Sequence, residues 1–383
     1  MIHSLSWLWH SLYESAAMFW EVLWALVFGF AVSALLQVFV SKERMTQALG
    51  RPGLREVALA TALGAASSSY SYAAVAAAWT AFKKGAALVP TLAFMFASTN
   101  LVFELGFVLW LLMGWHFVLA EFAGAFVLIG VMWLIVSLTL PKGLEDEARA
   151  HAEEADHNDH SGHDHSGHDH GDHAENEGGK FRAVADSFVM DWSMLWKEMA
   201  VGFVIAGLLA VLVPNGAWQS LFLTHTGSPT LKLLENAIVG PLIAVASFVC
   251  SVGNIPLASI LWSGGISFGG VIAFIYADLI IVPLILVYGK YYGRRAAIYI
   301  TLVLLASMVI AGLAVDLLFG FLHLIPTGPR PANALSNAHF AWNYTTWLDL
   351  LALAVAGSLA AAHYFAAPAA PAAHSDHEIK GNH

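Results

Sequence analysis

The sequence predicts an all-α membrane protein: a polytopic transmembrane bundle of about nine spans, in two related halves with helices that break near mid-membrane. Three observations predict this fold. Hydrophobic residues make up 58% of the 383 residues and charged residues only 11%, against about 25% charged in soluble domains. Long apolar runs recur along the chain, and polar stretches interrupt two of them. A soluble fold could not bury so much apolar surface, whereas lipid solvates it.

The apolar runs approach or exceed the about 20 residues that cross a bilayer as a helix. They are residues 22–40, 57–79, 88–113, 117–140, 199–213, 237–262, 271–288, 297–321 and 348–365. The segment before the first run has no Lys or Arg and no small-residue cleavage site, so we do not expect a signal peptide. Its apolar residues recur at helical spacing, which suits either an interfacial helix or an extension of the first span.

A polar, low-complexity insert at residues 142–180 separates the halves. Asp, Glu, His, Gly and Ser dominate it, so we expect it to be disordered without a ligand. The expected organisation is 1–141 as the first transmembrane half (an interfacial helix plus about four spans), 142–197 as a His/Asp-rich loop with an amphipathic lead-in, 198–323 as the second transmembrane half, 324–365 as an extra C-terminal span, and 366–383 as a disordered tail.

The halves carry similar features in the same order. The connector Gly50-Arg51-Pro52-Gly53-Leu54 resembles Gly227-Ser228-Pro229-Thr230-Leu231, and residues 67–79 align with 250–262 when their tryptophans are matched. Any two apolar helices look somewhat alike, but the shared order favours an internal duplication. Duplicated halves are common in transporters, where the substrate site lies at the repeat interface.

Positive charge in short loops predicts the orientation. The basic residues after the first span are Lys42, Arg44, Arg51 and Arg55, and those after the seventh are Lys290, Arg294 and Arg295. Both loops are cytoplasmic if the N-terminus is outside, which places the insert outside and the C-terminus inside. Lys83 and Lys84 contradict this topology unless they snorkel or the second span is partly re-entrant.

Two polar stretches lie in the middle of expected spans. In residues 248–256, Pro256 removes a helix hydrogen bond and Gly253 is flexible, which favours a broken helix that lines a cavity. The alternative is an ordinary proline kink. In the first half, six consecutive hydroxyl side chains begin at Ser67; they either contact a polar solute or hold packed helices together. The predicted substrate-binding residues are Ser67, Ser68, Ser69, Tyr70, Ser71, Asn100, Cys250, Ser251, Gly253, Asn254 and Pro256.

Acids in the following spans are candidates for proton or ion coupling. A carboxylate at membrane depth is costly and therefore suggests function. Glu104 and Asp278 fit this description, and Asp278 is the stronger candidate. Each could carry a proton, coordinate a cation or pair with a buried base. Glu121 and Asp316 lie nearer the ends of their spans, so we expect them at the interface.

The insert is rich in possible metal ligands. Residues 151–173 contain eight histidines, and Ser-Gly-His-Asp-His occurs twice. Imidazole with carboxylate suits zinc, nickel or cobalt, although a flexible loop binds them loosely. The predicted metal ligands are His163, His165, His168, His170 and His173. The tract could instead be a solvated spacer.

The stretch Cys250-Ser251-Val252-Gly253-Asn254-Ile255-Pro256 resembles the Cys-Ser-Cys-Gly-x-x-Pro motif of the predicted-permease family that includes the organoarsenical efflux permeases. Val252 replaces the second cysteine, and Gly269, Ala273-Phe274 and Ala277 continue the likeness. The first half departs from the motif, with Ser67-Ser68-Ser69-Tyr70 and Ala73 in its place. The resemblance implies solute efflux by a membrane permease. It does not imply arsenic, because one cysteine cannot supply several soft thiolates, and oxygen donors suit a more polar solute.

The sequence thus predicts a permease that exports a small solute across the cytoplasmic membrane, with proton coupling as an option. The alternative is a divalent transition-metal transporter with a His-rich sensing loop, and a non-transporting scaffold is a third class. No phosphate-binding loop or nucleophile–base pair indicates an enzyme, and no required cofactor is expected. The expected partners are the lipid bilayer and the transported molecule or ion, with no nucleic acid; a homo-oligomer stays open.

Overall fold

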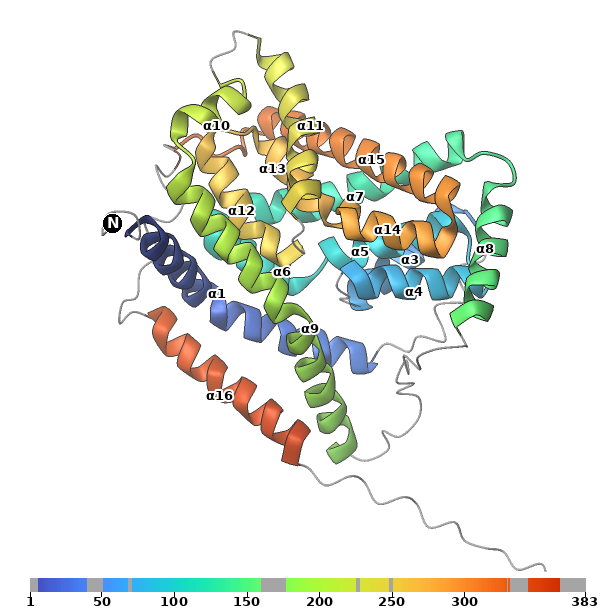
Figure 1. Ribbon diagram of the computed structural model, residues 1–383, viewed down its shortest axis with the longest axis horizontal. Helices are drawn as coiled ribbons and strands as arrows, with labels where there is room; N and C mark the ends of the chain where they lie inside the picture. The colour runs from blue at the N-terminus through green and yellow to red at the C-terminus, as the bar shows by residue number, and fades with distance from the viewer. Residues whose placement is uncertain are drawn as a thin grey trace, which may run out of the picture.

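A computed structural model describes residues 6–39, 51–67, 71–159, 177–224, 228–247, 251–328, 330 and 344–365, and within them the chain forms only helices and connecting turns (Figure 1). In the first half the helices are α1 (Ser6–Phe39), α3 (Leu54–Ser67), α4 (Ser71–Lys83), α5 (Leu88–Asn100), α6 (Phe103–Met113), α7 (Trp115–Thr139) and α8 (Leu144–Asp159). In the second they are α9 (Glu177–Leu212), α10 (Asn215–Leu221), α11 (Pro229–Ser247), α12 (Ser251–Gly264), α13 (Phe268–Ile275), the 3₁₀ helix η2 (Tyr276–Ile280), α14 (Val282–Tyr292), α15 (Arg294–Phe321) and α16 (Tyr344–Phe365).

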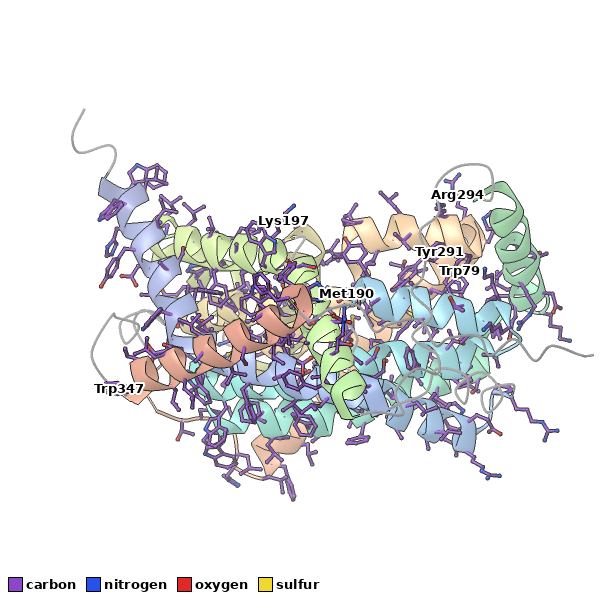
Figure 2. All side chains as sticks on the ribbon, turned by 90° about the horizontal axis from the view of Figure 1, so that it is seen from below. Trp79, Met190, Lys197, Tyr291, Arg294 and Trp347 are labelled. Atoms are coloured by element: carbon purple, nitrogen blue, oxygen red, sulfur yellow. The ribbon has the colours of Figure 1, made fainter. Side chains whose placement is uncertain are left out.

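The bundle has the length and surface of a membrane protein. Five described helices are long and apolar enough to cross a bilayer, or up to seven if each of two bent pairs counts as one span. The bent pairs are α5 with α6, at 46°, and α13–η2 with α14, at 44°. The second bend falls at Ile281, whose backbone is extended, and Pro283 lies at the start of the next helix, where its missing N–H costs nothing. Large apolar side chains cover the outside, as at Trp347 of α16, which is 66% exposed (Figure 2).

Two long helices differ from the expected boundaries. Helix α1 runs without a break through 34 residues, which favours the second of the two alternatives, an N-terminal segment that extends the first span. Helix α9 runs through 36 residues, so the expected boundary at residue 197 falls inside a continuous helix.

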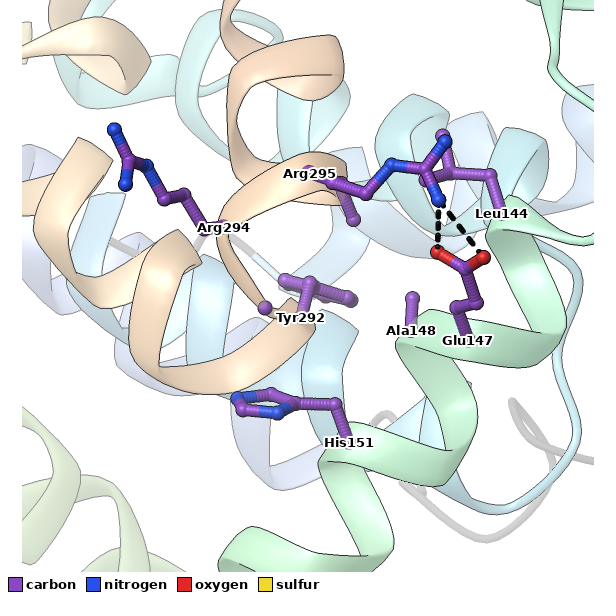
Figure 3. A pocket seen from close by; sticks show the side chains of 9 residues that line it. Leu144, Glu147, Ala148, His151, Tyr292, Arg294 and Arg295 are labelled. Atoms are coloured by element: carbon purple, nitrogen blue, oxygen red, sulfur yellow. Dashed lines mark hydrogen bonds and ion pairs between the residues drawn. The ribbon is translucent and has the colours of Figure 1, made fainter.

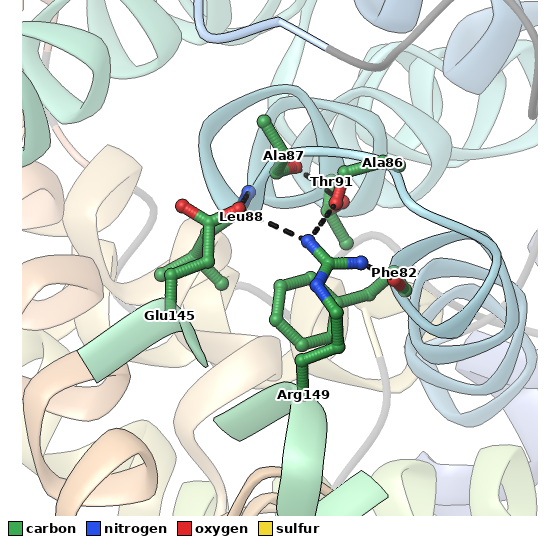
Figure 4. A network of polar contacts seen from close by, with 7 residues as sticks. All are labelled: Phe82, Ala86, Ala87, Leu88, Thr91, Glu145 and Arg149. Atoms are coloured by element: carbon green, nitrogen blue, oxygen red, sulfur yellow. Dashed lines mark hydrogen bonds and ion pairs between the residues drawn. The ribbon is translucent and has the colours of Figure 1, made fainter. Parts of the chain in front are cut away.

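Helix α8 corrects the prediction that the insert lacks structure. Its first turn holds acids that favour a helix start, and Leu144 is buried. The Arg149 guanidinium donates to the carbonyls of Phe82 and Ala86 and lies over the Phe82 ring, while Glu145 accepts from the Leu88 N–H at 3.2 Å (Figure 4). The composition of the insert did not predict this helix, because only a few of its residues make the contacts that hold it in place. Residues 160–176 lie outside the described part of the chain.

The runs predicted as the second and sixth spans turn back on themselves. In the α11–α12 hairpin, the Asn236 amide oxygen of α11 accepts from the Ser267 N–H at 3.0 Å, at the point where α12 has already ended. In the α3–α4 hairpin, Gly64 near the end of α3 lies against Phe94 and Ser98 near the end of α5. Helices α3 and α5 therefore run in the same direction and pack directly on each other, and α4, which connects them along the chain, packs on α5 and runs in the opposite direction. We call the ends of each hairpin that lie deepest in the bundle, around Ser71 and Ser251, the hairpin tips.

The hairpins enter from opposite ends of the bundle. The α8 end is where α4 ends, and there Arg295 pairs with Glu147 at 2.9 Å while a ring nitrogen of His151 lies 3.2 Å from the Lys290 carbonyl. Also at this end, the Trp79 ring of α4 stacks on the Tyr291 ring of α14 at 4.3 Å (Figure 2).

At the opposite end, which we call the Arg330 end, α12 finishes and α7 begins. The Phe117 ring of α7 packs on Trp262 and Phe268 at 5.1 and 4.8 Å. Arg330 donates to the carbonyls of Trp262 and Ile266 at 3.1 and 2.8 Å.

This arrangement corrects the predicted topology. We expected the insert and the Lys290–Arg295 loop on opposite sides, but α8 pairs with Arg295. The error came from counting residues 57–79 as a crossing, because length and hydropathy do not distinguish a span from a hairpin of two short helices. Lys83 then falls at the same end as Arg295, and its contradiction disappears.

Candidate functional site

The two hairpin tips meet at one buried acid. Ser71 begins α4, and its hydroxyl donates to Asp278 Oδ2 at 2.6 Å. Ser251 begins α12, and its hydroxyl lies close to the Asp278 carboxylate, whose Oδ1 atom has no hydrogen-bond partner in the described structure. Asp278 itself is fully buried in η2. The structure therefore brings three of the predicted site residues, one from each hairpin and one from η2, to a single point.

The local backbone explains why an acid is stable there. The first N–H groups of a helix have no partner within that helix, and the helix dipole gives its N-terminus a partial positive charge. Helices α4 and α12 both start at this point, so their N-terminal ends favour a negative group between them. Asp278 supplies that group from a short 3₁₀ segment that ends at the extended residue Ile281.

Asn254 adds a hydrogen-bond donor to the second tip. Its side-chain oxygen accepts from the Ser247 hydroxyl at 3.5 Å, which links α12 to the end of α11. Its amide nitrogen is buried and has no hydrogen-bond partner in the described structure. Pro256 lies within α12 and leaves the Val252 carbonyl without its helical donor. The second tip thus has more hydrogen-bonding capacity than its own helices use.

The other first-half candidates are less closely joined to this point. Ser67 ends α3 and is half-buried. The Asn100 amide nitrogen donates to the Phe96 carbonyl and to Thr99 within its own helix, both at 3.1 Å. Glu104 is buried, only 2% exposed, and packs against Gly29 of α1. The contacts of Asn100 described here lie within α5, and Glu104 packs on α1.

Glu121 is the site residue that sequence reasoning missed. We expected it at the interface, but it is fully buried and interacts electrostatically with Asp278. The Tyr276 hydroxyl donates to the Glu121 carbonyl at 2.7 Å, and Gly124, one turn further on, leaves room for the Tyr276 ring. Glu121 lies near the start of α7, which led us to predict that it lies at the membrane interface. Aromatic rings of α12 and α13 cover that end of α7, and Glu121 is therefore buried. Asp316 does lie near the end of its helix, where its carboxylate accepts from the Gly269 N–H at 2.6 Å.

Several predicted residues cannot be placed. Ser68, Ser69, Tyr70, Cys250, His163, His165, His168, His170 and His173 lie outside the described residues. In the parts of the chain that the structure describes, no three His, Cys, Asp or Glu side chains gather in a way that could hold a metal ion. The metal prediction for the insert therefore stays a prediction.

A separate cavity lies at the α8 end. It has a volume of about 230 Å³ and opens between α8 and the turn from α14 to α15 (Figure 3). Its wall includes His151, Tyr292 and the Arg295–Glu147 ion pair. This cavity lies where α8 meets the transmembrane helices, away from the hairpin tips.

Comparison with known proteins gives two matches. A family model described as "Predicted permease" matches residues 10–317. The chain is 44% identical over 329 residues to a Mycobacterium tuberculosis protein named "Putative permease Rv2963", covering 84% of this chain and 79% of that protein. No solved structure matches the chain. The region that the family model matches includes both hairpins, Glu121 and Asp278, and ends before Arg330.

Proposed function

The chain belongs to the predicted-permease family, and on that premise we propose that it exports a small polar solute across the cytoplasmic membrane through a site between its two hairpin tips. It is a multi-pass membrane protein of a transporter family. The observation that carries the proposal is the Asp278 carboxylate, which is bonded to Ser71 of one hairpin and lies close to Ser251 of the other. A solute that enters between the tips must part these contacts, so binding and hairpin movement are linked.

The two halves support a site at a repeat interface. Helices α3 to α7 and α11 to α15 follow the same order, and α4 and α5 begin 180 residues before α12 and α13. Gly85 and Gly265, also 180 residues apart, make the same turn with φ of 102° and 109°. We infer an internal repeat whose halves enter from opposite sides, as in many transporters. This register pairs Phe82 with Trp262, three residues away from the alignment that matches Trp79 with Trp262.

The arginine contacts strengthen the case for the repeat. Arg149 lies over Phe82 and binds the last carbonyls of the α3–α4 hairpin, and Arg330 lies 3.7 Å over Trp262 and binds those of the α11–α12 hairpin. Neither arginine belongs to the helices it binds. Two hairpins with the same clamp at opposite ends are what an inverted duplication produces.

We infer that the α8 end faces the cytoplasm. Its basic residues are Lys83, Lys84, Lys142, Arg149, Lys290, Arg294 and Arg295, and positive charge marks the cytoplasmic side of short loops. The end of α16 lies on this side too, because His363 pairs with Asp186 of α9 at 2.6 Å. This orientation keeps the expected outer N-terminus and inner C-terminus, and moves the insert to the inside.

Proton coupling follows from what holds the tips. An ionised Asp278 accepts the hydrogen bond from Ser71, attracts the nearby Ser251 hydroxyl and favours both helix N-termini. A protonated Asp278 loses its charge and part of its accepting capacity, so the tips separate more easily. The two serine hydroxyls are then free to donate, and together with the Asn254 amide, which has no partner in the described structure, they suit a solute rich in oxygen acceptors.

Flux in vesicles tests this function. Full-length protein is reconstituted into proteoliposomes, and solutes that harm a strain lacking the gene are offered with and without a proton gradient. We expect gradient-dependent flux of at least one acceptor-rich solute, and Asp278→Asn to lose its dependence on the gradient. Full gradient-dependent flux in the Asp278→Asn protein would contradict coupling through this residue. No flux of any such solute in well-folded wild-type protein would contradict the permease itself.

The alternative cargo, a divalent transition metal, rests on the histidine tract of the insert. The same vesicles, offered zinc or nickel ions, test it directly. Metal flux that persists without residues 160–176 would favour a metal cargo, whereas metal binding without flux would restrict the tract to a sensing role.

A further inference from the structure

Glu121 is a buried acid to which the solute site gives no role. It lies six residues into α7, yet its side chain is fully buried. Neither carboxylate oxygen has a hydrogen-bond partner in the described structure. Most buried polar groups are hydrogen-bonded, so an acid with both oxygens unpaired calls for an explanation.

The surroundings of Glu121 lead to Asp278. The Tyr276 hydroxyl fixes the Glu121 backbone to η2, the same short segment that carries Asp278. The two carboxyl groups are close enough to interact electrostatically. Two ionised carboxylates in a low-dielectric interior repel each other, and an unpaired one there is costly by itself. Binding of a positive charge in this region would remove the free-energy cost of the two buried carboxylates.

The neighbouring helices do not supply that charge. The ionisable groups that interact with Glu121 are Asp278 and Tyr276. Of the other helices packed against α7, α5 and α13 carry no ionisable residue, and α6 carries only Glu104. On α15 the ionisable residues are Arg294, Arg295 and Tyr299 toward the α8 end and Asp316 toward the Arg330 end. Both arginines lie at the far end of the bundle, where Arg295 is already paired with Glu147.

We propose that Glu121 is a second proton-binding group coupled to Asp278, so that the two carboxyl groups form one proton-binding centre. Each carboxylate takes up one proton at an oxygen atom and becomes a neutral acid, which removes the repulsion between them. Coupled sites of this kind titrate as a pair. The pairing rests on the burial of both acids, on the unpaired oxygens of Glu121 and on the Tyr276 bond that joins α7 to η2, and only its use in transport rests on the proposed function.

Infrared spectroscopy tests the pair without any solute. The C=O absorption of protonated carboxyl groups is followed as the pH of purified full-length protein is changed, in wild type, Glu121→Gln, Asp278→Asn and the double variant. We expect two coupled components in wild type. Each single variant should lose one component and move the midpoint of the other by about one pH unit or more.

Two further variants make the outcome specific. Glu121→Asp retains a carboxyl group and should keep both components. Glu235→Gln removes an acid on α11 that lies outside the pair and is bonded to Asn236, and it should leave the two components of the pair and their midpoints unchanged. Loss of one component with no shift in the other would overturn the coupling, and an unchanged spectrum in Glu121→Gln would overturn the second site.

Sodium is tested in the same titration. If sodium chloride, but not choline chloride, removes both components, the centre binds sodium and the proton assignment is overturned. If the two groups titrate together but the flux does not depend on the proton gradient, the pair is supported and proton-coupled export is contradicted. The experiments can therefore contradict one proposal without contradicting the other.

Discussion

At the residue scale, depth along a helix proved a poor guide to burial. Asp278 stood out in the sequence because apolar residues surround it, and the structure places it under both hairpin tips. Glu121 has equally apolar neighbours, but its distance from the helix start suggested an interface. The rings that cover it come from residues more than a hundred positions away, and no local pattern contains that information.

The serines at the two tips give a prediction at this scale. Replacing Ser71 with alanine removes a hydrogen bond to the buried Asp278 carboxylate, an interaction of about 1.5–3 kcal/mol. Replacing Ser251 with alanine removes a second hydroxyl that lies close to the same carboxylate. We expect each change to alter the flux rate about 10-fold or more. The pH dependence of the flux should change too, because separation of the tips no longer depends on whether Asp278 is protonated.

Ser263→Ala is the matched control. The Ser263 hydroxyl bonds to the Ser259 carbonyl within α12 at 2.9 Å, so its loss should leave flux and pH profile unchanged. If the tip variants behave like this control, the tips do not depend on their bonds to Asp278.

At the element scale, the sequence located nearly every helix but did not determine how some of them connect. A break was predicted in residues 248–256 from Gly253 and Pro256, but both residues lie inside the continuous helix α12, and α11 ends before them, at Ser247. Packing against α5 and α13 determines whether the chain continues across the membrane or turns back after a break. The sequence of the apolar segment alone does not predict this packing. Helix α8 was missed for the opposite reason, because its composition is that of a solvated loop and its stability comes from Arg149 and Leu144.

The arginine clamps give the prediction for this scale. Arg149→Ala and Arg330→Ala each leave the last carbonyl groups of a hairpin helix without a hydrogen-bond donor. Basic side chains commonly bind these carbonyls at the C-terminus of a helix. We expect each to lower the free energy of unfolding by about 1–3 kcal/mol, measured by thermal denaturation in detergent. Lysine should not restore it, because a single ammonium cannot reach two carbonyls and stack on a ring as guanidinium does.

The exposed Arg294 at the α8 end serves as control. Arg294→Ala removes the same charge without a carbonyl contact and should leave the melting temperature unchanged. Equal losses in all three variants would assign the effect to charge rather than to the clamps.

At the scale of the whole molecule, sidedness depends on the hairpins. If residues 57–79 are counted as a transmembrane span, the insert is predicted on the outer side of the membrane. Because these residues form the α3–α4 hairpin instead, the insert lies on the same side as the Lys290–Arg295 loop. Hydropathy reports how apolar a segment is but not where its two ends lie. The helical membrane class could be predicted from composition, while the topology required contacts between distant segments.

Thiol labelling checks the sidedness. Cys250 is the sole cysteine of the sequence, so Cys250→Ser provides a background without thiols. A cysteine in place of Ser166, in the insert, should react with an impermeant maleimide only after the cells are opened. Reaction in intact cells would place the insert outside and contradict the inferred orientation.

Deletion of residues 160–176 separates the histidine tract from the transport path. The change leaves α8 and its contacts in place, so we expect flux to persist. Divalent metal binding should be lost, and in the intact protein it should weaken as pH falls through about 6.5, where imidazole is protonated. Calorimetry with zinc and nickel ions measures the binding. No heat from the wild-type protein would contradict it, and loss of flux in a well-folded deletion would place the tract in the mechanism.

The clamps at the hairpin bases also have a mechanical consequence. Helix α4 has 13 residues, so its tip lies about 20 Å from the base that Arg149 holds, at 1.5 Å per residue. With the base as pivot, a rigid rotation of about 10° on this lever arm moves the tip by about 3.5 Å. That displacement exceeds the 2.6 Å length of the bond from Ser71 to Asp278. A tilt small enough to preserve the packing at the membrane surface is therefore large enough to open the centre.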